Sequence, residues 1–452
     1  MNRKINNDNT PIVIKLPEIK DNIFDHDEEP VFSTNIDYPK FSLGFHHYIH
    51  QSKDKMKEIL NDFKSKKKVY LVMNKYEPII DDYDKAIGNV ADTYFSLKSK
   101  PKILNNAFYK LWEMLMTFDL IPNNDKIVTA HLAEGSGAFI QATIMYRDMF
   151  AKNVNGDKYY ALTLHPDDIK GHIEPLDEAF IKHYKSEKPS RFVQHRTFSR
   201  KMARGNKNKD NGDLTDPKTI KLFTDDLGDT KADFITADGG FNWTNESTQE
   251  QDAFKLIISQ ICVALKIQKK GGNFVCKIYE SFSLITSKLI CILLACYTNV
   301  HITKPFTSRK GNSEKYLVCI GFKGINDKYL DKLENVLKQS YKNKNKNIVN
   351  IFPKFDAPKY LLTTLTYIND VIANRQYISI NEIVDFVNKQ NYRGDEYHDR
   401  KEMQIKSSEF WIDRYFVDKS KLQDSKKVLT DELNKIVEQN KDEIDKFDKI
   451  LE

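Results

Sequence analysis

The sequence predicts an α/β protein in which a mostly parallel sheet is covered by helices on both faces. Three observations support this prediction. The 452 residues are enough to bury a large core. Between about residues 96 and 325, apolar segments typical of buried strands alternate with segments of helical length. Two of those strands also stop at a single charged residue, which is typical of strands that end at a ligand site.

The expected strands and helices alternate along this central region. The strands are expected at 126–133, 158–165, 232–238, 272–279, 299–305 and 315–322. The helices are expected at 102–119, 136–150, 247–269 and 281–297. Each strand is a short apolar run bounded by polar residues or glycine, and most are separated by a helix that can carry the chain back for a parallel crossover.

The regions on either side differ in composition, so three domains are expected. Residues 1–95 form an N-terminal extension that is expected to be partly disordered, with a strand-like segment at 68–74. Residues 96–325 form the α/β domain. Residues 326–452 are rich in charged segments of helical periodicity and are expected to be mainly helical.

Charge and cysteine usage exclude some classes of protein. The formal charge of +6 is too mild to establish a polyanionic partner, although basic clusters recur, including 196–209 and 307–312. Such clusters are either solvated loops or phosphate contacts. The five cysteines form no CxxC or Cys/His cluster, so neither zinc nor a disulfide framework is expected. The longest apolar run, 289–297, is too short to span a membrane, and an intracellular protein is expected.

The two strands that stop at a charge are "ADFITAD" and "GNFVCKIY", which place Asp238 and Lys277 at or near their carboxyl ends. Parallel strands bring these ends to one edge of the sheet, where ligands bind. Asp238 precedes two glycines and could be an ordinary turn residue. Lys277 is harder to explain structurally, because an ammonium at the end of a buried strand needs a partner or a function.

A glycine-rich turn follows the first strand in "HLAEGSGAF", residues 131–139. Glycine permits positive φ and a close approach of ligand to backbone. A single GxG is weak, but its position after the first strand favours an adenosine-containing ligand. The sequence is not a GxxxxGK[ST] loop, so ATP hydrolysis is disfavoured.

Six motifs in order resemble the FtsJ/RrmJ-type 2′-O-ribose methyltransferases, and more narrowly the mRNA cap 2′-O-methyltransferases of eukaryotes and large DNA viruses. The segments that carry this resemblance are "HLAEGSGAFIQA", "YYALTL", "NGDLTDP", "ADFITADGGF", "GGNFVCKIYESFS" and "KPFTSRKGNSEKYLVCIGFKG". They cover about half of the chain and neither terminal region. The resemblance implies a Rossmann-like fold that uses S-adenosylmethionine (SAM).

The family uses a Lys-Asp-Lys-Glu tetrad, and the resemblance places it on Lys110, Asp238, Lys277 and Glu314. Transfer to a ribose hydroxyl needs an aligned nucleophile and a group that accepts its proton. A lysine whose pKa is lowered by burial and by a second ammonium can accept that proton, which assigns the role to Lys277 and tuning or substrate orientation to Lys110. The two carboxylates would hold the lysines by charge-assisted hydrogen bonds. No metal is required.

The resemblance also implies a SAM site. Its expected residues are Glu134, Gly135, Ser136, Gly137, Phe139, Asp213 and Asp238. Asp213 is expected to accept a hydrogen bond from the adenine amino group, and its ordinary alternative is a turn with Gly212. The family often has proline where this chain has Ser136. The ribose contact is left open between His165, Asp167 and neither.

The implied function is methylation of the 2′-hydroxyl of the first transcribed nucleotide at the 5′ end of capped RNA. Ser308, Arg309 and Lys310 are expected to contact the RNA. The alternatives are an internal ribosomal or transfer RNA target, or a non-catalytic scaffold for RNA capping. Other capping or transcription proteins are expected partners, no membrane is involved, and a cytoplasmic location is expected, at the site of viral RNA synthesis if the protein is viral.

Overall fold

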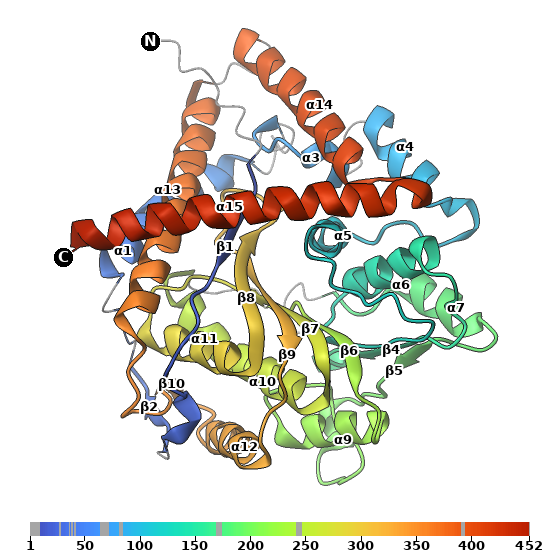
Figure 1. The fold of residues 1–452 in the computed structure, drawn as a ribbon, viewed down its shortest axis with the longest axis vertical. Helices are drawn as coiled ribbons and strands as arrows, with labels where there is room; N and C mark the ends of the chain where they lie inside the picture. Colours follow the sequence, from blue (N-terminus) through green and yellow to red (C-terminus); the bar gives the residue numbers. More distant parts are fainter. Residues whose placement is uncertain are drawn as a thin grey trace.

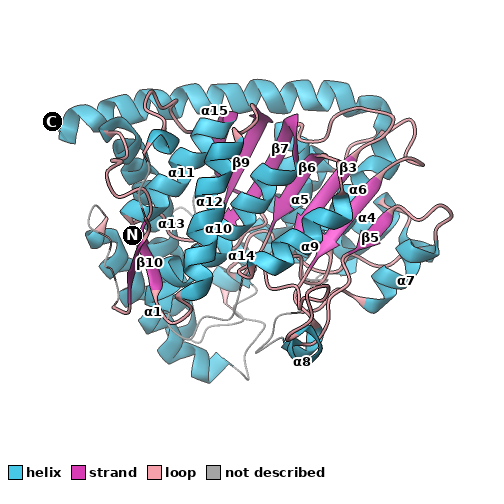
Figure 2. Ribbon diagram, turned by 90° about the horizontal axis from the view of Figure 1, so that it is seen from below, coloured by secondary structure: helices cyan, strands magenta, loops and turns pink. Residues whose placement is uncertain are grey.

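The computed structural model describes residues 10–26, 29–35, 37, 39, 42–63, 72–80, 85–168, 174–240, 246–389 and 394–451. Its centre is an eight-stranded sheet with the order β1-β8-β9-β7-β6-β3-β4-β5 and helices on both faces (Figures 1 and 2). The strands are β1 Ile12–Lys15, β3 Val128–Leu132, β4 Lys158–Leu162, β5 Phe192–Gln194, β6 Ala232–Ala237, β7 Gln268–Ile278, β8 Tyr297–Lys304 and β9 Lys315–Phe322.

The sheet has a parallel half and an antiparallel half. Strands β5, β4, β3, β6 and β7 pair in parallel, whereas β9 pairs antiparallel with β7 and β8, and β1 pairs antiparallel with β8. The α/β class and all six expected strands are confirmed. The sheet is nevertheless mixed, because three of its seven pairings are antiparallel. The two strands that sequence analysis missed, β1 and β5, are short edge strands.

Helices bury each face of the sheet in a separate hydrophobic core. One core contains residues of α9 Pro217–Leu227, α10 Gln249–Ile267, α11 Leu284–Cys296 and α12 Asp327–Lys342. The other contains residues of α3 Glu77–Ile80, α5 Ala107–Phe118, α6 Ala138–Phe150, α14 Asp395–Tyr415 and α15 Leu422–Leu451. Helix α7, Glu178–Ser186, closes a smaller core beside β4 and β5. The expected helices correspond to α5, α6, α10 and α11, each within a few residues.

The C-terminal region is mainly helical, as expected, and packs on the α/β domain. Helix α15 crosses the molecule beside β1 and α5 (Figure 1), and Asn440 Nδ2 donates to the Val13 carbonyl at 2.9 Å. Trp112 Nε1 in α5 donates to the Tyr415 carbonyl at 2.9 Å. Glu113, also in α5, accepts from Phe306 N at 2.7 Å and from Trp411 Nε1 at 3.1 Å. These bonds fix α5 and the segment that follows β8.

The N-terminal region also packs on this domain. Strand β1 is the sheet's edge next to β8, and β2, Val31–Ser33, pairs with β10, Asn347–Asn350. Helix α1, Leu43–Phe63, packs along α13, Lys359–Lys389. Helix α4 is Lys85–Tyr94. Of the strand expected at 68–74, only 72–74 are described, and they are not in a strand. The proposed boundaries at 95 and 325 stay predictions.

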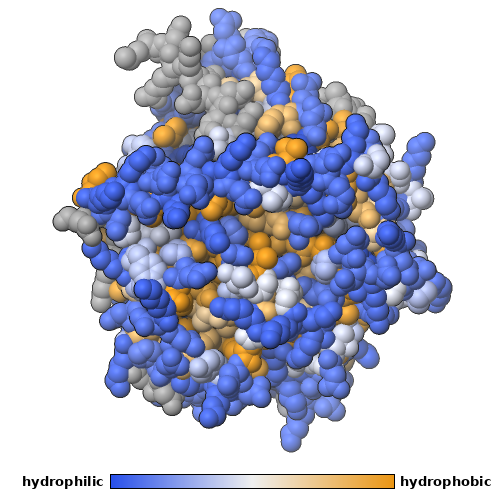
Figure 3. Space-filling model, viewed as in Figure 1, coloured by the Kyte–Doolittle hydropathy of each residue, from blue (hydrophilic) through white to orange (hydrophobic). Residues whose placement is uncertain are grey.

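The surface agrees with a domain whose apolar side chains are mostly internal. Figure 3 shows a face that is largely hydrophilic, with apolar residues visible in its middle below the position of α15. Among the described residues, no helix is both long enough and apolar enough to cross a membrane. No group of three or more His, Cys, Asp or Glu side chains in the described ranges is placed to hold a metal ion.

Candidate active site

The two strand ends singled out in the sequence meet at one edge of the sheet. Ala237 of β6 lies opposite Cys276 of β7 in a parallel pair, which brings Asp238 and Lys277 together. Lys277 Nζ lies 3.2 Å from Asp238 Oδ1 and donates to the Asp238 carbonyl at 2.7 Å. Both side chains are less than a fifth exposed, at 12% and 17%. The register of two parallel strands therefore creates one half of the predicted tetrad.

The other half comes from α5 and from the residue that precedes β9. Lys110 Nζ lies 2.8 Å from Glu314 Oε1, and both side chains are largely buried. Burial alone raises the pKa of Glu314, but the ammonium groups of Lys110 and Lys277 outweigh it and hold this pKa at about 2. Tyr316 of β9 donates to Asp238 Oδ1 at 3.2 Å. The structure thus gathers all four predicted residues as two lysine–carboxylate pairs.

The protonation of Lys277 differs from the expectation. Burial alone lowers the pKa of Lys277, but the negative charges of Asp238 and Glu314 outweigh burial and raise it above the ordinary lysine value. The prediction of a lowered pKa is therefore wrong for this arrangement of side chains. Lys277 is an ammonium held by a carboxylate, and it can accept a proton only after a further positive charge has offset that carboxylate and Nζ has lost its own proton.

Two glycines after Asp238 leave room for these side chains. A Cβ at Gly239 would lie 2.5 Å from Gln260 Oε1 and 2.7 Å from Leu256 Cδ2. A Cβ at Gly240 would lie 2.5 Å from the Tyr279 hydroxyl and 3.4 Å from Lys277 Nζ. The "DGG" sequence is thus required because the helix behind it and the lysine strand beside it approach the backbone closely.

We expect Gly240→Ala to slow catalysis without unfolding the protein. The new methyl group would clash with the Tyr279 hydroxyl and displace the Tyr279 ring, which lies beside the Lys277 ammonium, and a displacement near 1 Å at the reacting groups costs roughly 10- to 100-fold in rate. The measurement is kcat beside a thermal unfolding curve. The double variant Gly240→Ala/Tyr279→Phe removes the clashing hydroxyl and should recover most of the rate. A double variant as slow as Gly240→Ala would refute the steric explanation.

The glycine-rich turn lies at the same edge of the sheet, after β3. Gly137 has φ +102, and a Cβ there would lie 3.3 Å from Leu176 and Phe180. Ser136 Oγ accepts from Asn105 Nδ2 at 2.6 Å, so a side-chain bond ties this loop where the family often has proline. Glu134 Oε1 accepts from Phe139 N at 3.1 Å, which ties the loop to the start of α6.

Glu134 is the feature of this loop that indicates a cationic ligand group. Its side chain is buried, and Oε2 has no hydrogen-bond partner among the described residues. Burial and the nearby charge of Asp238 raise the pKa of Glu134 to about 8. Two adjacent carboxyl groups, one of them incompletely satisfied, suit a ligand that carries an ammonium and a sulfonium. The site therefore fits SAM, with Glu134, Asp238 and the backbone of Gly135 to Gly137 as the residues that would hold it.

The affinity for SAM should rise with pH between about 6 and 7.5. Glu134 is mainly protonated below its pKa of about 8. A bound cation favours the carboxylate, so binding releases a proton and is helped as pH rises toward that pKa. The window ends near 7.5, because an α-amino group of the ligand begins to lose its own proton at about 7.7 to 8.0. Calorimetric titrations in two buffers would measure the released proton, and Glu134→Gln should abolish it. Equal proton release by Glu134→Gln and wild type would contradict this assignment.

The loop expected at the adenine lies over the end of β4. His165 N donates to the Asn211 carbonyl at 2.8 Å, and a Cβ at Gly212 would lie 2.1 Å from the Thr163 carbonyl oxygen. Asp213 Oδ1 accepts from Thr215 N at 3.0 Å and from Thr215 Oγ1 at 2.7 Å. Asp213 thus forms a turn with Thr215 rather than with Gly212, and the adenine contact stays a prediction. His165 Nδ1 accepts from Asp167 N at 3.2 Å, and the ribose contact also stays open.

The segment expected to contact RNA is tied into the protein. Ser308 is buried and its Oγ donates to Glu314 Oε1 at 2.8 Å, so it supports the tetrad. Arg309 pairs with the fully buried Glu77 of α3 at 2.5 Å, and its side chain remains 31% exposed. Lys310 is exposed. An RNA contact by Arg309 or Lys310 remains a prediction, whereas Ser308 has little surface to offer.

Lys304, which was not among the residues predicted from the sequence, organises this segment. At the end of β8, Lys304 Nζ donates to the Asn312 carbonyl at 2.9 Å, to Asn312 Oδ1 at 2.7 Å and to the Glu314 carbonyl at 2.7 Å. Burial, against the charge of Glu314, lowers the pKa of Lys304 to about 7. The signal that identified Lys277, a lysine at the end of a buried strand, applies equally to Lys304.

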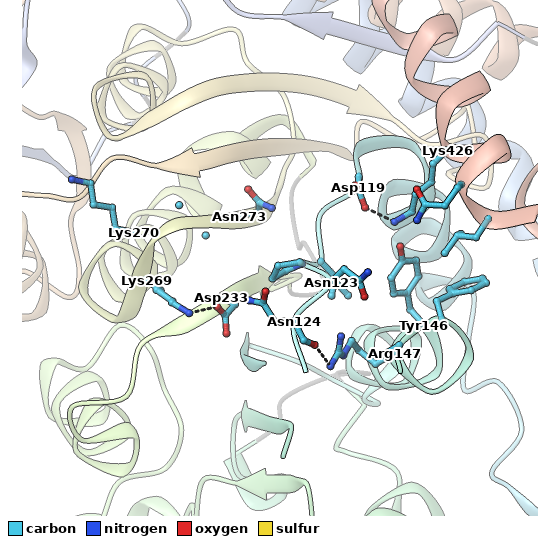
Figure 4. A pocket seen from close by; sticks show the side chains of 18 residues that line it. Asp119, Asn123, Asn124, Tyr146, Arg147, Asp233, Lys269, Lys270, Asn273 and Lys426 are labelled. Carbon is cyan, nitrogen blue, oxygen red and sulfur yellow. Dashed lines mark hydrogen bonds and ion pairs between the residues drawn. The ribbon is translucent and has the colours of Figure 1, made fainter. Parts of the chain in front are cut away.

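A cleft of about 580 Å³ lies at the amino ends of the parallel strands, opposite the strand ends that carry the tetrad. It is lined by residues at the starts of β6 and β7, by the end of α6 and by α15 (Figure 4). Several of the charged groups that line it are in ion pairs: Lys269 Nζ lies 2.8 Å from Asp233, Lys426 contacts Asp119, and Arg147 binds Asp157 at 2.9 Å. Because this cleft is at the amino ends of the parallel strands, it is separate from the tetrad.

Comparison with known proteins is consistent with this site. Residues 103–322 match the family of FtsJ-like methyltransferases. The chain is 31% identical over 195 residues to a Caenorhabditis briggsae cap-specific mRNA (nucleoside-2′-O-)-methyltransferase 1A. The aligned residues make up 40% of this chain and 22% of that protein. A second protein of that organism, named an inactive form 1B, is 29% identical over 195 residues, 40% of this chain and 23% of its own length.

Among solved structures, a Plasmodium falciparum protein described as a ribosomal RNA methyltransferase aligns with a TM-score of 0.33 and 22% identity, over 49% of this chain and 100% of that one. The chain spans less than a quarter of the length of the two curated relatives named above. What those proteins do as wholes therefore bears on this chain only as a proposal.

Proposed function

We propose that the chain, whose residues 103–322 match the family of FtsJ-like methyltransferases, methylates the 2′-hydroxyl of the first transcribed nucleotide of capped RNA. One observation carries the proposal: Lys277–Asp238 and Lys110–Glu314 meet at the carboxyl edge of the sheet, beside the glycine-rich loop. Two buried ammonium groups can bind a hydroxyl oxygen and neighbouring phosphate, while two carboxylates keep both lysines in position.

Each residue of the site has a distinct role in methyl transfer. SAM, when bound, supplies the methyl group and a positive charge near Asp238. Asp238 and Tyr316 hold Lys277 at one position, and Ser308 holds Glu314, which holds Lys110. Positive charge in the pocket offsets the pull of Asp238, so that Lys277 can release its own proton to solvent; the neutral amine then orients the 2′-hydroxyl and takes its proton at Nζ as the methyl group is transferred. Lys110 orients the substrate and adds to that positive charge.

Likeness of sequence alone does not decide activity, because one of the relatives is named inactive. The presence and pairing of all four charged side chains favour an active enzyme over a non-catalytic scaffold. A scaffold has no need to bury two lysines and two carboxylates in one pocket, since such groups cost stability unless they are fully paired. An internal ribosomal or transfer RNA target is the alternative within the same chemistry.

Three matched RNAs separate these possibilities. The protein is incubated with methyl-labelled SAM and with RNAs that carry a 7-methylguanosine cap, a plain triphosphate, or a structured internal target. We expect label in the capped RNA alone. Equal labelling of the triphosphate RNA would refute the cap requirement, labelling of the structured target alone would favour the internal alternative, and labelling of none would favour a scaffold.

Two further predictions stay open. Other capping or transcription proteins are proposed as partners, and the terminal regions that pack on the methyltransferase domain are the surfaces to test. A cytoplasmic location, at the site of viral RNA synthesis if the protein is viral, is likewise a proposal.

A further inference from the structure

A basic segment, residues 196–209, projects from the sheet edge that carries the tetrad. It follows β5 directly and includes the short helix α8, Arg200–Ala203, which Figure 2 shows below the sheet, apart from the helices that cover its faces. The segment contains six basic residues and no acidic one. They are Arg196, Arg200, Lys201, Arg204, Lys207 and Lys209, and all but Lys209 are exposed. We call residues 196–209 the basic arm.

The base of the basic arm is clamped rather than loose. Buried His195 lies between two carboxylates, with Nε2 2.9 Å from Asp210 and Nδ1 2.5 Å from Asp226 of α9. Burial lowers the pKa of His195, but the two carboxylates outweigh it and raise this pKa to about 9. Phe198 N donates to the Asp210 carbonyl at 2.7 Å. The two ends of the basic arm are therefore joined by charge-assisted bonds that persist at neutral pH.

A second tether holds the far part of the basic arm. Lys218 Nζ in α9 donates to the carbonyls of Ala203 and Asn206, both at 3.0 Å. The positive charges are consequently presented on fixed backbone. This reduces the entropy that would be lost when they bind a partner.

The charges of the basic arm are crowded in a way that favours an anionic partner. The Arg196 guanidinium lies 4.9 Å from the centre of the Phe198 ring, and Lys209 Nζ lies 4.8 Å from it. Two cations on one ring repel each other, and no acidic residue lies within the arm to offset them. A polyanion that runs past the arm would relieve this repulsion.

The position of the basic arm relative to the tetrad favours RNA as this polyanion. The basic arm leaves the end of β5, which is three strands from β6 in the sheet order, so its start lies roughly 14 Å from the level of Asp238. Asp210, at the base of the arm, also accepts from Gly212 N at 2.8 Å and thereby contacts the loop expected at the cofactor. An RNA whose first ribose reaches Lys277 can therefore continue toward the basic arm.

We propose that the basic arm binds phosphates of single-stranded RNA beyond the methylated nucleotide. This inference rests on the proposed function for the identity of the RNA, but it concerns binding and is tested separately from turnover. The arm would act through charge and not through base identity, because its cations lie on an exposed surface without a built pocket. It would therefore distinguish long RNA from short RNA rather than one sequence from another.

The test compares two triple variants of equal charge loss. The arm variant is Lys201→Gln/Arg204→Gln/Lys207→Gln, and the control variant is Lys427→Gln/Lys435→Gln/Lys441→Gln on α15, where the three lysines are also exposed. Affinity for a single-stranded RNA of several tens of nucleotides is measured against salt concentration. We expect the arm variant to reduce the slope of log K against log salt by about 2, since each lost phosphate contact removes about 0.7. The control variant should leave the slope unchanged.

The second readout is methyl transfer. With capped RNA of several tens of nucleotides, the arm variant should raise KM about tenfold with kcat unchanged, whereas a capped RNA of a few nucleotides should be methylated as by wild type. An unchanged salt slope would overturn the proposal and would point to an acidic protein surface as the partner of the arm. Absence of methyl transfer by wild type would refute the proposed function and leave the binding result standing.

Discussion

Lys277→Met is expected to abolish methyl transfer while SAM still binds. Lys277 is the group placed to take the proton of the attacking hydroxyl, and loss of such a group lowers the rate by about 10²- to 10⁴-fold. Loss of the ammonium also removes a hydrogen bond that orients the hydroxyl, so we expect the upper end of this range. SAM affinity should change little, because Glu134, Asp238 and the glycine-rich loop are retained. Single-turnover rates and equilibrium binding measure the two effects separately.

Lys277→Arg separates proton acceptance from orientation. Arginine keeps the positive charge beside Asp238 but is not deprotonated in proteins. If Lys277 accepts the proton, Lys277→Arg should be nearly as slow as Lys277→Met. A rate for Lys277→Arg within about tenfold of wild type would show that Lys277 only orients the substrate. Because the pKa of Lys277 is raised by Asp238, the wild-type rate should also increase with pH until the lysine is deprotonated.

Lys53→Met is expected to reduce the free energy of unfolding by about 3 to 5 kcal/mol, the range for breaking a buried ion pair on one side. Lys53 Nζ in α1 lies 2.8 Å from Glu280 Oε1, and their side chains are 8% and 3% exposed. Burial alone raises the pKa of Glu280, but Lys53 outweighs it and holds this pKa at about 2. Glu280 stands three residues after Lys277, so activity should fall together with stability. Chemical denaturation measures the loss.

Two variants control this result. Lys57→Met changes an exposed lysine of the same helix, whose side chain is 49% exposed, and should cost less than about 1 kcal/mol. Lys53→Met/Glu280→Met removes both charges and should recover much of the lost stability, because no buried charge is left unpaired. A loss for Lys53→Met no larger than for Lys57→Met would contradict the view that α1 is docked on the catalytic strand by this pair.

The low pKa of Glu280 in the folded protein also predicts how stability changes at acid pH. An ordinary glutamate in the unfolded chain titrates near 4.3, above the folded value of about 2. The unfolded chain therefore binds the proton more readily, and the stabilising contribution of Glu280 is present above about pH 4.3 and is lost as pH falls toward 2. Lys53→Met/Glu280→Met should lose less stability over this window than wild type does.

The sequence indicated candidate site residues where a charged residue stands at the end of a buried strand, a position that has few purely structural explanations. Asp238 and Lys277 end parallel strands, and strand order alone makes such ends neighbours. The glycines of "DGG" were visible as a turn, but the sequence could not show that the Tyr279 hydroxyl and Gln260 amide fill the space beside them. The site was thus predicted as a set of residues, while the contacts that fix its geometry required the structure.

The features that were predicted wrongly or missed also have physical explanations. The lowered pKa expected for Lys277 considered burial and a second ammonium, but the nearest charge is the carboxylate of Asp238 at 3.2 Å. Strand β1 was missed because four residues at a sheet edge carry little periodicity, and it lies far in sequence from its partner β8. The tether of Arg309 to Glu77 joins residues 232 positions apart, and no local pattern signals such a pair.

The most direct test of the central claim is methyl transfer to two capped RNAs that differ only at the first transcribed nucleotide. One carries a ribose there and the other a 2′-deoxyribose. If Lys277 and its three partners direct transfer to the 2′-hydroxyl of that nucleotide, label from SAM should enter the ribose RNA and not the deoxyribose RNA. Equal labelling of the two RNAs would contradict the account, because the methyl group would then be placed on a different atom.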